Sequence, residues 1–544
     1  MLHAGLPLST SPLIARRHFL WGSAAVAALA AGCANTGKPA NQTLVIGTAT
    51  KPNTFDPQYQ YFGPNRQAHM PVFEPLVMYG PGLELKPALA TGWRTVDDTS
   101  WEITLRPNAV FHDGSPFVAE DVVFSLDRAG KVPNSPSSMG VFVRSIERIE
   151  IINPMTLRIR TKAAVPLLMN DLANVPIISK KISGGATTAA FNAGSGVVGT
   201  GPYRFVKWED TLIEYEAFEG HWGGRQPWRR VHVLTMEKAQ ARVQALLAEQ
   251  CQLIDQVPPE SLAMLRATPH VSLFDIPSNF LMFLHMDQAR EFTPFVTDKQ
   301  GRQIPNPLRD VRVRKALSLA IDRAALTRDV LGNAAVPANQ LLPPNFPGTI
   351  KGLSSIPYDP QAARQLLAAA GYANGFRLLM HGTDGRYASD KQSLAAIAAG
   401  LREIGIDAQS VSLPSNEFFA RASAGTGKNG EPEFSVIQVG WASVEPSAAL
   451  KGLLATPNKS TSFGSSNRGM YSSRSVDDTL ARALQTVDSR IREDLIRAAT
   501  RQAVVEDQGV VPLYYPTSTW ATLKHVRYAP RVDSATYPMD ATVA

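Results

Sequence analysis

Cysteine is nearly absent from this sequence of 544 residues, which contains only Cys33 and Cys251. Two cysteines cannot supply a disulfide framework or a cysteine-rich zinc or iron–sulfur site. The ten histidines also lack the spacing that metal ligands show in a sequence. We therefore expect neither a metal centre nor a bound cofactor.

Long apolar runs and clusters of basic residues are missing as well. After the N-terminal region no segment approaches the ~20 apolar residues that cross a bilayer as a helix. The formal net charge is +7, but lysine and arginine are scattered and form no runs that would track phosphates. These absences argue against a polytopic membrane protein and against a nucleic-acid partner.

Signatures of catalysis are missing too. There is no H-E-x-x-H motif, P-loop or nucleophile elbow. Residues 194–199 match G-x-G-x-x-G, but Pro202 and Tyr203 follow where a dinucleotide-binding motif needs a helix. We expect a protein that is not an enzyme.

What is present indicates a large globular chain. Apolar residues make up 44% of the sequence and charged residues 19%, which excludes an intrinsically disordered protein. The length favours two or three domains.

The N-terminus has the parts of an export signal. Arg16 and Arg17 precede a short stretch of small and apolar residues that ends at Cys33. The arginine pair resembles the twin-arginine signal. Ala15 and Trp21 depart from its usual pattern, so the general secretion route stays open. By either route, we expect export.

The signal ends in Leu29-Ala30-Ala31-Gly32-Cys33, which resembles a lipobox. Cys33 would then become the lipid-modified first residue, with plain cleavage as the alternative. Residues 34–42 are small and polar and predict a flexible tether. With Cys33 lipidated, Cys251 has no partner and is predicted to be a buried, unreactive thiol.

Strand and helix patterns alternate after residue 43, which predicts a mixed α/β protein with open sheets covered by helices, in more than one lobe. Strands are expected at residues 44–47, 99–106, 146–152, 155–161, 201–208, 212–218, 230–236, 376–380, 406–411, 434–440 and 509–515. Helices are expected at residues 119–128, 238–250, 311–331, 361–370, 389–404 and 476–507.

Several sequence blocks follow one another along this body. They include Ala90-Thr91-Gly92-Trp93, Phe111-His112-Asp113-Gly114, Gly199-Thr200-Gly201-Pro202-Tyr203, His221-Trp222-Gly223-Gly224, Val313-Arg314-Lys315-Ala316-Leu317, Tyr358-Asp359-Pro360 and Gly440-Trp441. In this order the blocks resemble one family, the extracellular solute-binding proteins of dipeptide, oligopeptide and nickel ABC importers (solute-binding protein family 5). The resemblance covers most of the chain.

The resemblance implies an α/β, two-lobed, periplasmic-binding-protein-like fold (type II, large class) with an extra subdomain on lobe I. Residues 1–33 would be the export signal and residues 34–42 the tether. Residues 43–80, 200–284 and 511–544 would form lobe I, residues 81–199 the extra subdomain, and residues 285–510 lobe II.

The resemblance also implies a function. The chain would be a substrate-binding lipoprotein in the periplasm of a Gram-negative bacterium, anchored to the membrane by its lipid and monomeric. It would bind a peptide-like or other small polar ligand in the cleft between the lobes and deliver it to an ABC permease and ATPase complex. The alternative is an exported ligand-binding module, a sensor or a chaperone-like peptide holder, without an import role.

One candidate site follows the strand expected at residues 434–440. In peptide-binding relatives a Trp-x-x-Asp segment supplies the carboxylate that pairs with the peptide's α-amino group. Here Trp441 is present, but Val444 stands where the Asp is expected, and Glu445 comes next. We expect Trp441 and Glu445 to contact the ligand; a structural tryptophan and a surface glutamate are the alternatives.

Arg386 and Tyr387 form a second candidate, between a strand end and a helix start, where cleft residues gather in open α/β sheets. Arg386 could bind a ligand carboxylate through its planar guanidinium, with an exposed loop arginine as the alternative. Tyr59, Phe62 and Asn65 are expected to line the facing wall of the cleft, with core packing as the alternative.

Overall fold

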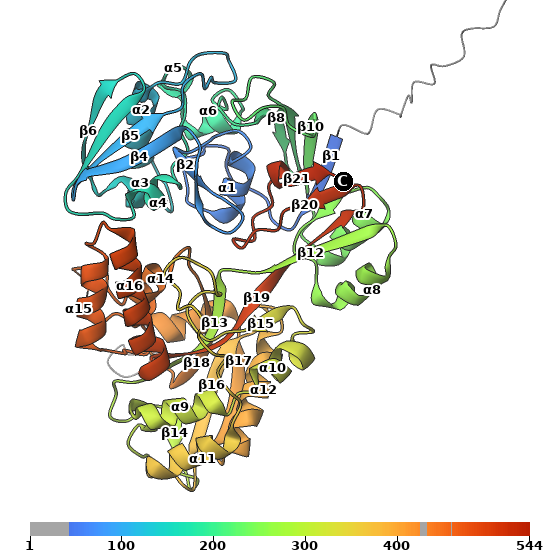
Figure 1. Cartoon of the computed structure of the whole chain (residues 1–544). Coiled ribbons are helices and arrows are strands. Elements are labelled where there is room, and N and C mark those ends of the chain that lie inside the picture. The colour runs from blue at the N-terminus through green and yellow to red at the C-terminus, as the bar shows by residue number, and fades with distance from the viewer. Residues whose placement is uncertain (1–42, 425–431, 459) are drawn as a thin grey trace, which may run out of the picture. The chain divides into compact units, whose positions relative to one another are not determined.

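The computed structural model describes residues 43–424, 432–458 and 460–544. Within it, the chain from Thr43 to Ala544 forms one unit of contacts, in which two lobes are joined by long strands (Figure 1). No helix of these described residues is both long and apolar enough to span a membrane. The predicted signal residues Arg16 and Arg17, the predicted lipidation site Cys33 and the tether lie outside the described residues.

The sheet of lobe I is built around its first strand. β1 has the sequence TLVIGT, in which Leu44 and Ile46 are fully buried. Its parallel neighbours are β10 and β11, and antiparallel strands continue the sheet on both sides. The strands are β1 (Thr43–Thr48), β8 (Tyr203–Glu209), β9 (Leu212–Ala217), β10 (Arg230–Thr235) and β11 (Leu253–Ile254), with helices α1 (Gly63–His69), α7 (Ala239–Leu247) and α8 (Leu262–Ala267) beside it.

An extra subdomain carries its own four-stranded antiparallel sheet in the order β4-β5-β7-β6. On β5 the buried residues Trp101, Ile103 and Leu105 alternate with Glu102 and Thr104, so one face packs on helices and the other faces water. The elements are β2 (Val77–Tyr79), β3 (Leu85–Pro87), β4 (Ala90–Asp97), β5 (Ser100–Leu105), α2 (Ala119–Ala129), α3 (Gly140–Val143), β6 (Ile146–Asn153), β7 (Thr156–Thr161), α4 (Leu168–Leu172), α5 (Lys180–Ser183) and α6 (Thr188–Asn192).

Several of the sequence blocks meet where this subdomain joins lobe I. The buried carboxylate of Glu74 accepts hydrogen bonds from Thr200 Oγ1 at 2.9 Å and from Trp222 Nε1 at 2.9 Å. Nε2 of His221 lies 3.2 Å from the same carboxylate. A Cβ atom on Gly199 would overlap the carbonyl oxygen of Val72, so the close approach of the two backbones requires glycine. These blocks therefore shape the scaffold.

Lobe II has a sheet that is covered on both faces. One core contains residues of α9, α11 and α12, and a second core on the opposite face contains residues of α13 to α16. The strands are β13 (Phe280–Met286), β14 (Val296–Thr297), β15 (Ala335–Pro337), β16 (Arg377–Thr383), β17 (Asp407–Leu413) and β18 (Val436–Ala442). The helices are α9 (Val311–Leu319), α10 (Arg323–Ala325), α11 (Pro360–Ala369), α12 (Asp390–Glu403), α13 (Ser415–Phe419), α14 (Pro446–Ala449), α15 (Arg474–Ala483) and α16 (Ser489–Thr500).

Two predicted helices are each divided in the structure. The helix expected at residues 311–331 breaks after α9, and Asp322 begins α10 by accepting a hydrogen bond from the Ala325 amide. The helix expected at residues 476–507 breaks between α15 and α16, where Asp488 accepts from the Ile491 amide. In both places an aspartate that caps a new helix ends the continuous pattern.

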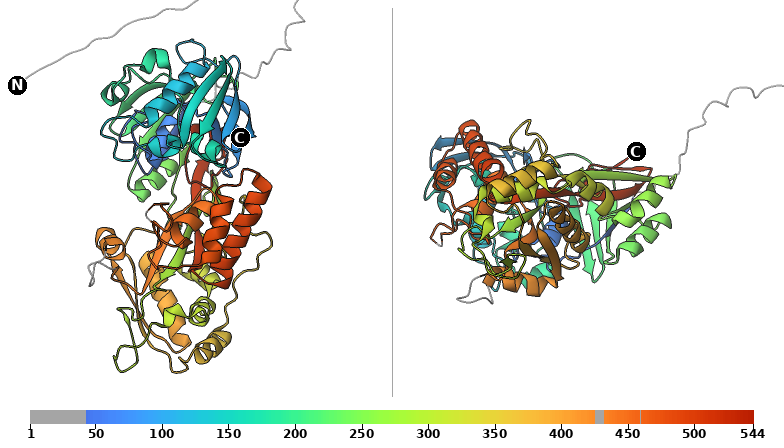
Figure 2. Two further views of the ribbon diagram at one scale, coloured as in Figure 1. Left: turned by 90° about the vertical axis from the view of Figure 1, so that its left-hand side faces the viewer. Right: turned by 90° about the horizontal axis from the view of Figure 1, so that it is seen from below.

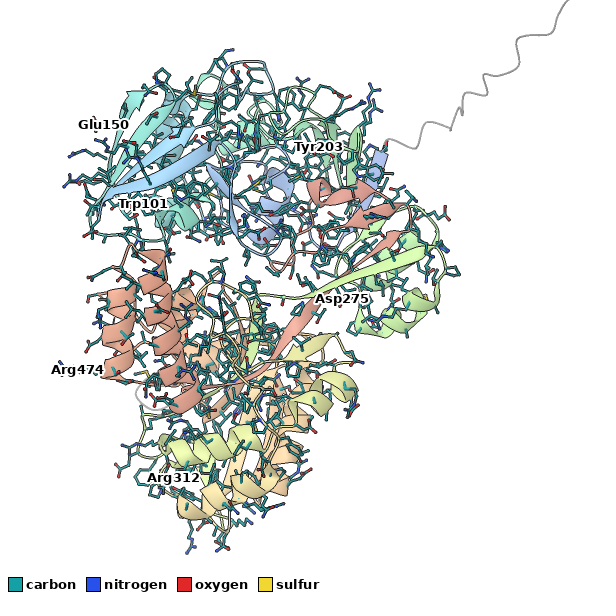
Figure 3. All side chains as sticks on the ribbon, in the orientation of Figure 1. Trp101, Glu150, Tyr203, Asp275, Arg312 and Arg474 are labelled. Carbon is teal, nitrogen blue, oxygen red and sulfur yellow. The ribbon has the colours of Figure 1, made fainter. Side chains whose placement is uncertain are left out.

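Two strands connect the lobes. β12 (Val271–Pro277) belongs to lobe I, and after Ser278 and Asn279 the chain continues as β13 of lobe II. β19 (Val510–Leu523) returns antiparallel to both, pairing with β13 and β15 in its first half and with β12 and β11 in its second. Figure 3 marks Asp275 on β12 beside this crossing. The predicted domain boundaries stay a prediction.

The C-terminal segment returns to lobe I as β20 (Val526–Tyr528) and β21 (Ala541–Val543). On lobe II, α15 and α16 lie below the strands of the extra subdomain (Figure 2, left). Val444 and Val487 of lobe II pack against the core of that subdomain. The lobes therefore touch through side chains at this side as well as through the two strands.

Candidate functional site

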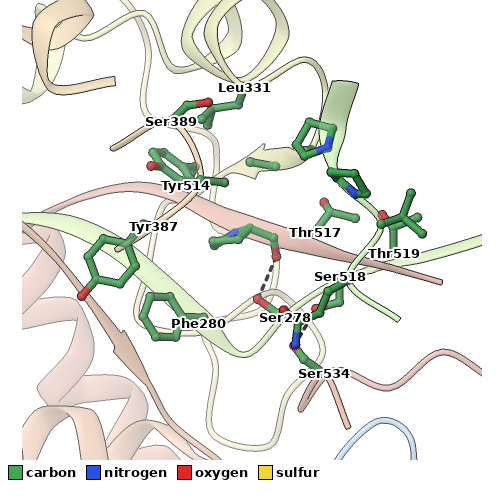
Figure 4. A pocket seen from close by; sticks show the side chains of 18 of the residues that line it. Ser278, Phe280, Leu331, Tyr387, Ser389, Tyr514, Thr517, Ser518, Thr519 and Ser534 are labelled. Carbon is green, nitrogen blue, oxygen red and sulfur yellow. Dashed lines mark hydrogen bonds between the residues drawn. The ribbon is translucent and has the colours of Figure 1, made fainter. Parts of the chain in front are cut away.

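A cavity of about 540 Å³ lies at the crossing of the two connecting strands (Figure 4). Segments of both lobes form its walls. Lobe I contributes Gln256, Val257, Pro258, Pro259, Thr517, Ser518, Thr519, Trp520 and Ser534; lobe II contributes Phe280, Met282, Leu331, Ala334, Ala335, Arg386, Tyr387, Ala388, Ser389 and Tyr514; Ser278 and Pro516 lie at the crossing itself. A molecule in this cavity would contact both lobes.

The loop that carries Arg386 and Tyr387 is organised by Asp390, which is 5% exposed. One carboxylate oxygen of Asp390 accepts from Thr383 Oγ1 at 2.7 Å and from the amides of Arg386 and Tyr387. The other oxygen accepts from the Gly385 amide at 3.1 Å and from the Lys391 amide. A carboxylate with several amide donors holds a loop in one conformation.

Sequence reasoning did not select Asp390. The signal was available, because an acidic residue in the first turn of a predicted helix, after a short Gly-containing loop, is a common device for satisfying loop amides.

Arg386 is exposed, and its Nε donates a hydrogen bond to the Tyr387 hydroxyl at 3.2 Å. Its guanidinium carbon lies 4.9 Å from the centroid of the Phe419 ring, which provides a cation–π contact. The Tyr387 hydroxyl also accepts from the Gly440 amide at 3.4 Å, and its ring lies 5.7 Å from that of Phe280. These contacts place both predicted residues at the cavity wall.

Aromatic and hydroxyl side chains complete the cavity, and the sequence analysis did not select them. Burial raises the pKa of Tyr514 to about 12, so its phenol stays a neutral hydrogen-bonding group. Ser518 and Ser534 are hydrogen bonded to each other at 2.5 Å, and Ser278 Oγ donates to the Pro516 carbonyl at 2.7 Å. Phe280, Met282 and Ser518 were missed because β13 and the second half of β19 were not predicted.

Trp441 and Glu445 do not line the cavity. Trp441 pairs with Leu281 across β18 and β13, and Leu281 belongs to the core on the α13–α16 face. Phe280 and Met282, the neighbours of Leu281, line the cavity from the other face of the strand. Strand alternation thus turns the Trp441 ring away from the cavity, and its buried Nε1 has no hydrogen-bond partner among the described residues.

Glu445 caps helix α14. Its carboxylate accepts from the Ser447 amide at 2.8 Å, from Ser447 Oγ at 2.6 Å and from the Ala448 amide at 2.8 Å. Burial, only partly offset by these hydrogen bonds, raises the pKa of Glu445 above its ordinary value.

The three residues predicted on lobe I are apart from the cavity as well. Tyr59 donates its hydroxyl hydrogen to the Asn134 carbonyl at 2.9 Å, and Asn65, 1% exposed, exchanges hydrogen bonds with Asn53. Phe62 is 41% exposed at the start of α1. The structure therefore brings two of the seven predicted residues, Arg386 and Tyr387, to the cavity; ligand contact by the other five stays a prediction.

Two observations concern metal binding and the reactivity of the free cysteine. Within the described residues no group of three or more His, Cys, Asp or Glu side chains could hold a metal ion. Cys251 is a buried free thiol, and burial raises its pKa to about 11, so it is the unreactive thiol that the sequence predicted.

Comparisons with known proteins agree with this architecture. A family profile described as "Bacterial extracellular solute-binding proteins, family 5 Middle" matches residues 84–461. The glutathione-binding protein GsiB of Escherichia coli (strain K12) is 28% identical over 499 residues, which cover 89% of this chain and 90% of that protein.

Two solved structures share the fold. HbpA2 from Haemophilus parasuis superposes with a TM-score of 0.79 at 22% identity, covering 92% of this chain and 100% of the other. The periplasmic binding protein DppA from Helicobacter pylori, solved with the peptide STSA, gives a TM-score of 0.67 at 22% identity, covering 92% and 98%. These neighbours confirm the predicted two-lobed α/β fold.

Proposed function

Because the chain belongs to family 5 of the bacterial extracellular solute-binding proteins, a family of binding proteins and not of enzymes, we propose that it collects a small peptide-like or polar ligand for an ABC importer. The ligand binds in the cavity at the crossing strands and is handed unchanged to the permease. The observation that carries the proposal is the cavity itself, whose walls come from both lobes.

The connecting segments support a hinge at this cavity. Asn279, 8% exposed, donates its side-chain amide to the Ser443 carbonyl at 2.9 Å, and its backbone amide donates to the Val532 carbonyl at 2.9 Å. It thus ties both lobes to the short link between β12 and β13. Opening of the lobes about this link would separate the cavity walls and release the ligand, and closure would bring them together.

In the proposed site, Arg386 and Tyr387 contact the ligand from lobe II, while hydroxyl groups of Thr517, Ser518 and Ser534 contact it from lobe I. Buried polar atoms of a ligand require such partners, because each unpaired one costs about 1–3 kcal/mol. The predicted residues Trp441, Glu445, Tyr59, Phe62 and Asn65 are not part of this site, and ligand contact by them stays a prediction.

The proposal places the protein in the periplasm as a monomeric lipoprotein. The N-terminal sequence supports it, since Arg16 and Arg17 lie in the predicted export signal of residues 1–33 and Cys33 ends its lipobox-like segment. We expect Cys33→Ser to move the protein from the membrane fraction to the soluble periplasmic fraction. A variant that still sediments with membranes would exclude the anchor.

The import role is tested with the compound that the purified protein retains. That compound is released by denaturation, identified by mass spectrometry and offered in labelled form to cells with and without the gene. We expect uptake to fall at least tenfold without the gene. Unchanged uptake would instead support the alternative, an exported binding module that serves a sensor or holds peptides.

A further inference from the structure

The cavity has an unusual charge balance. Of its 21 lining residues Arg386 is the one with a charged side chain, and none is Asp, Glu, Lys or His. The remaining lining is aromatic, aliphatic or neutral and polar, with hydroxyl groups at Ser278, Thr517, Ser518, Thr519 and Ser534. A ligand in the cavity therefore meets one cation and no anion.

Three carboxylates that adjoin lining residues in the sequence already bind other groups of the protein. Asp390 accepts five hydrogen bonds from its own loop and helix. Asp255 accepts from the Ala49 amide at 2.9 Å and lies 3.6 Å from Arg242. Asp533 faces the guanidinium of Arg531, with contacts of 3.0 and 3.1 Å. None of these three carboxylates is free to pair with a ligand.

The segment that follows Trp441 offers no carboxylate to a ligand either. Val444 stands three positions after Trp441, and the carboxylate of Glu445 caps the N-terminus of α14. An ammonium group or a metal cation that entered the cavity would lose its hydration without gaining a counter-charge, and such a burial is costly.

Arg386, unlike these carboxylates, has no ion-pair partner among the described residues. The described residues contain no carboxylate within ion-pair distance of its guanidinium, and its Nε bonds only to the Tyr387 hydroxyl. The ring of Phe419 supports the flat guanidinium from one side. A carboxylate that approaches the free Nη groups could form two parallel hydrogen bonds.

From this balance, and resting on the proposed function, we infer that the ligand is a small carboxylic acid with neutral polar groups and no free ammonium group. N-acylated amino acids, N-blocked peptides and hydroxy acids belong to this class. The carboxylate pairs with Arg386. The neutral polar groups bind the serine and threonine hydroxyls, and apolar parts lie against Phe280, Tyr514 and Trp520. The cavity disfavours ligands that carry a free amino terminus.

The test uses the full mature chain and a small-molecule extract of bacterial cells, supplemented with a dipeptide in three forms: free, N-acetylated and C-terminally amidated. Bound compounds are recovered by denaturation and identified by mass spectrometry. Amine-selective acylation and methyl esterification then report which retained compounds carry an amino group and which a carboxyl group. The variant is Arg386→Gln, and the control is Arg302→Gln, which removes an exposed arginine that pairs with Asp298.

We expect the retained compounds to esterify but not to acylate. Arg386→Gln should retain them at least tenfold less, the loss of a charge-assisted pair, while Arg302→Gln retains them fully. Retention of amine-bearing compounds, or full retention by Arg386→Gln, would overturn the inference and leave the proposed function standing. If the protein retains nothing, both fail.

Discussion

Single residues decide the shape of the binding loop, and Asp390 is the clearest case. Its carboxylate accepts from Thr383 and from the amides of residues 385–387 and 391. We expect Asp390→Asn to cost about 2–3 kcal/mol, because the new amide nitrogen would face N–H donors. Hydrogen exchange at residues 385–387 should quicken in the ligand-free protein. Asp384→Asn, in the same loop but exposed, should leave that exchange unchanged.

Glycine at the junction of lobe I and the extra subdomain gives a second prediction at this scale. Gly199→Ala should destabilise the fold by about 3 kcal/mol, because the added methyl group overlaps the Val72 carbonyl. Gly92→Ala serves as the control, since no atom lies within 4 Å of its added Cβ. Equal midpoints of urea unfolding for the two variants would refute the steric argument.

The sequence anticipated the residues that local pattern defines. Arg386 and Tyr387 could be selected because a strand end, a short loop and a helix start lie next to one another in the chain. Trp441 could not be assigned to a face, because which side of the sheet it occupies depends on its pairing with Leu281, a long-range register that local pattern does not contain.

At the scale of helices and strands, the sequence predicted amphipathic helices and alternating strands best. The strands expected at residues 146–152 and 155–161 are present as β6 and β7, which pair with each other in antiparallel fashion. β13 was missed because six of its seven residues are buried, so it shows no alternation between polar and apolar positions. The divided helices were predicted as continuous because the breaks come from single capping aspartates.

The start of α16 supplies the prediction at this scale. Asp488 accepts from the Ile491 amide at 3.0 Å, so Asp488→Ala should lower the free energy of unfolding by about 1 kcal/mol. Asp494→Ala, within the same helix and away from its N-terminus, should cost less. The comparison requires thermal melts of both variants. If Asp494→Ala costs more, then capping does not set this helix boundary.

For the whole molecule, the contact between the extra subdomain and lobe II predicts a pH dependence. Asp171 on α4 has its pKa raised to about 7, mainly by burial. Arg144 of the extra subdomain and Lys451 of lobe II act to lower this pKa, and Glu445 of lobe II acts to raise it. The folded chain therefore binds this proton more tightly than the unfolded chain, for which the pKa is about 3.9. Stability should fall as the pH rises from about 4 to about 7.

Asp171→Asn should remove this dependence. The variant should match the unchanged protein near pH 4 and exceed it by about 2 kcal/mol at pH 8, as measured by urea unfolding at each pH. Asp127→Asn, on the exposed side of α2, should show the original pH profile. A parallel profile for Asp171→Asn and the unchanged protein would show that burial of Asp171 has no energetic consequence.

The fold as a whole could be predicted through family resemblance, while the position of the cavity could not. The cavity depends on where β12, β13 and β19 exchange partners between the lobes, and such pairings join residues that are hundreds of positions apart. Local sequence patterns therefore do not predict which strands pair at the crossing.

The most direct measurement is hydrogen–deuterium exchange over the full chain, with and without the compound that the protein retains. Binding between the lobes predicts slower exchange on both cavity walls together, at residues 386–389 of lobe II and at residues 517–519 and 534 of lobe I. Protection confined to one lobe, or located away from these segments, would contradict it.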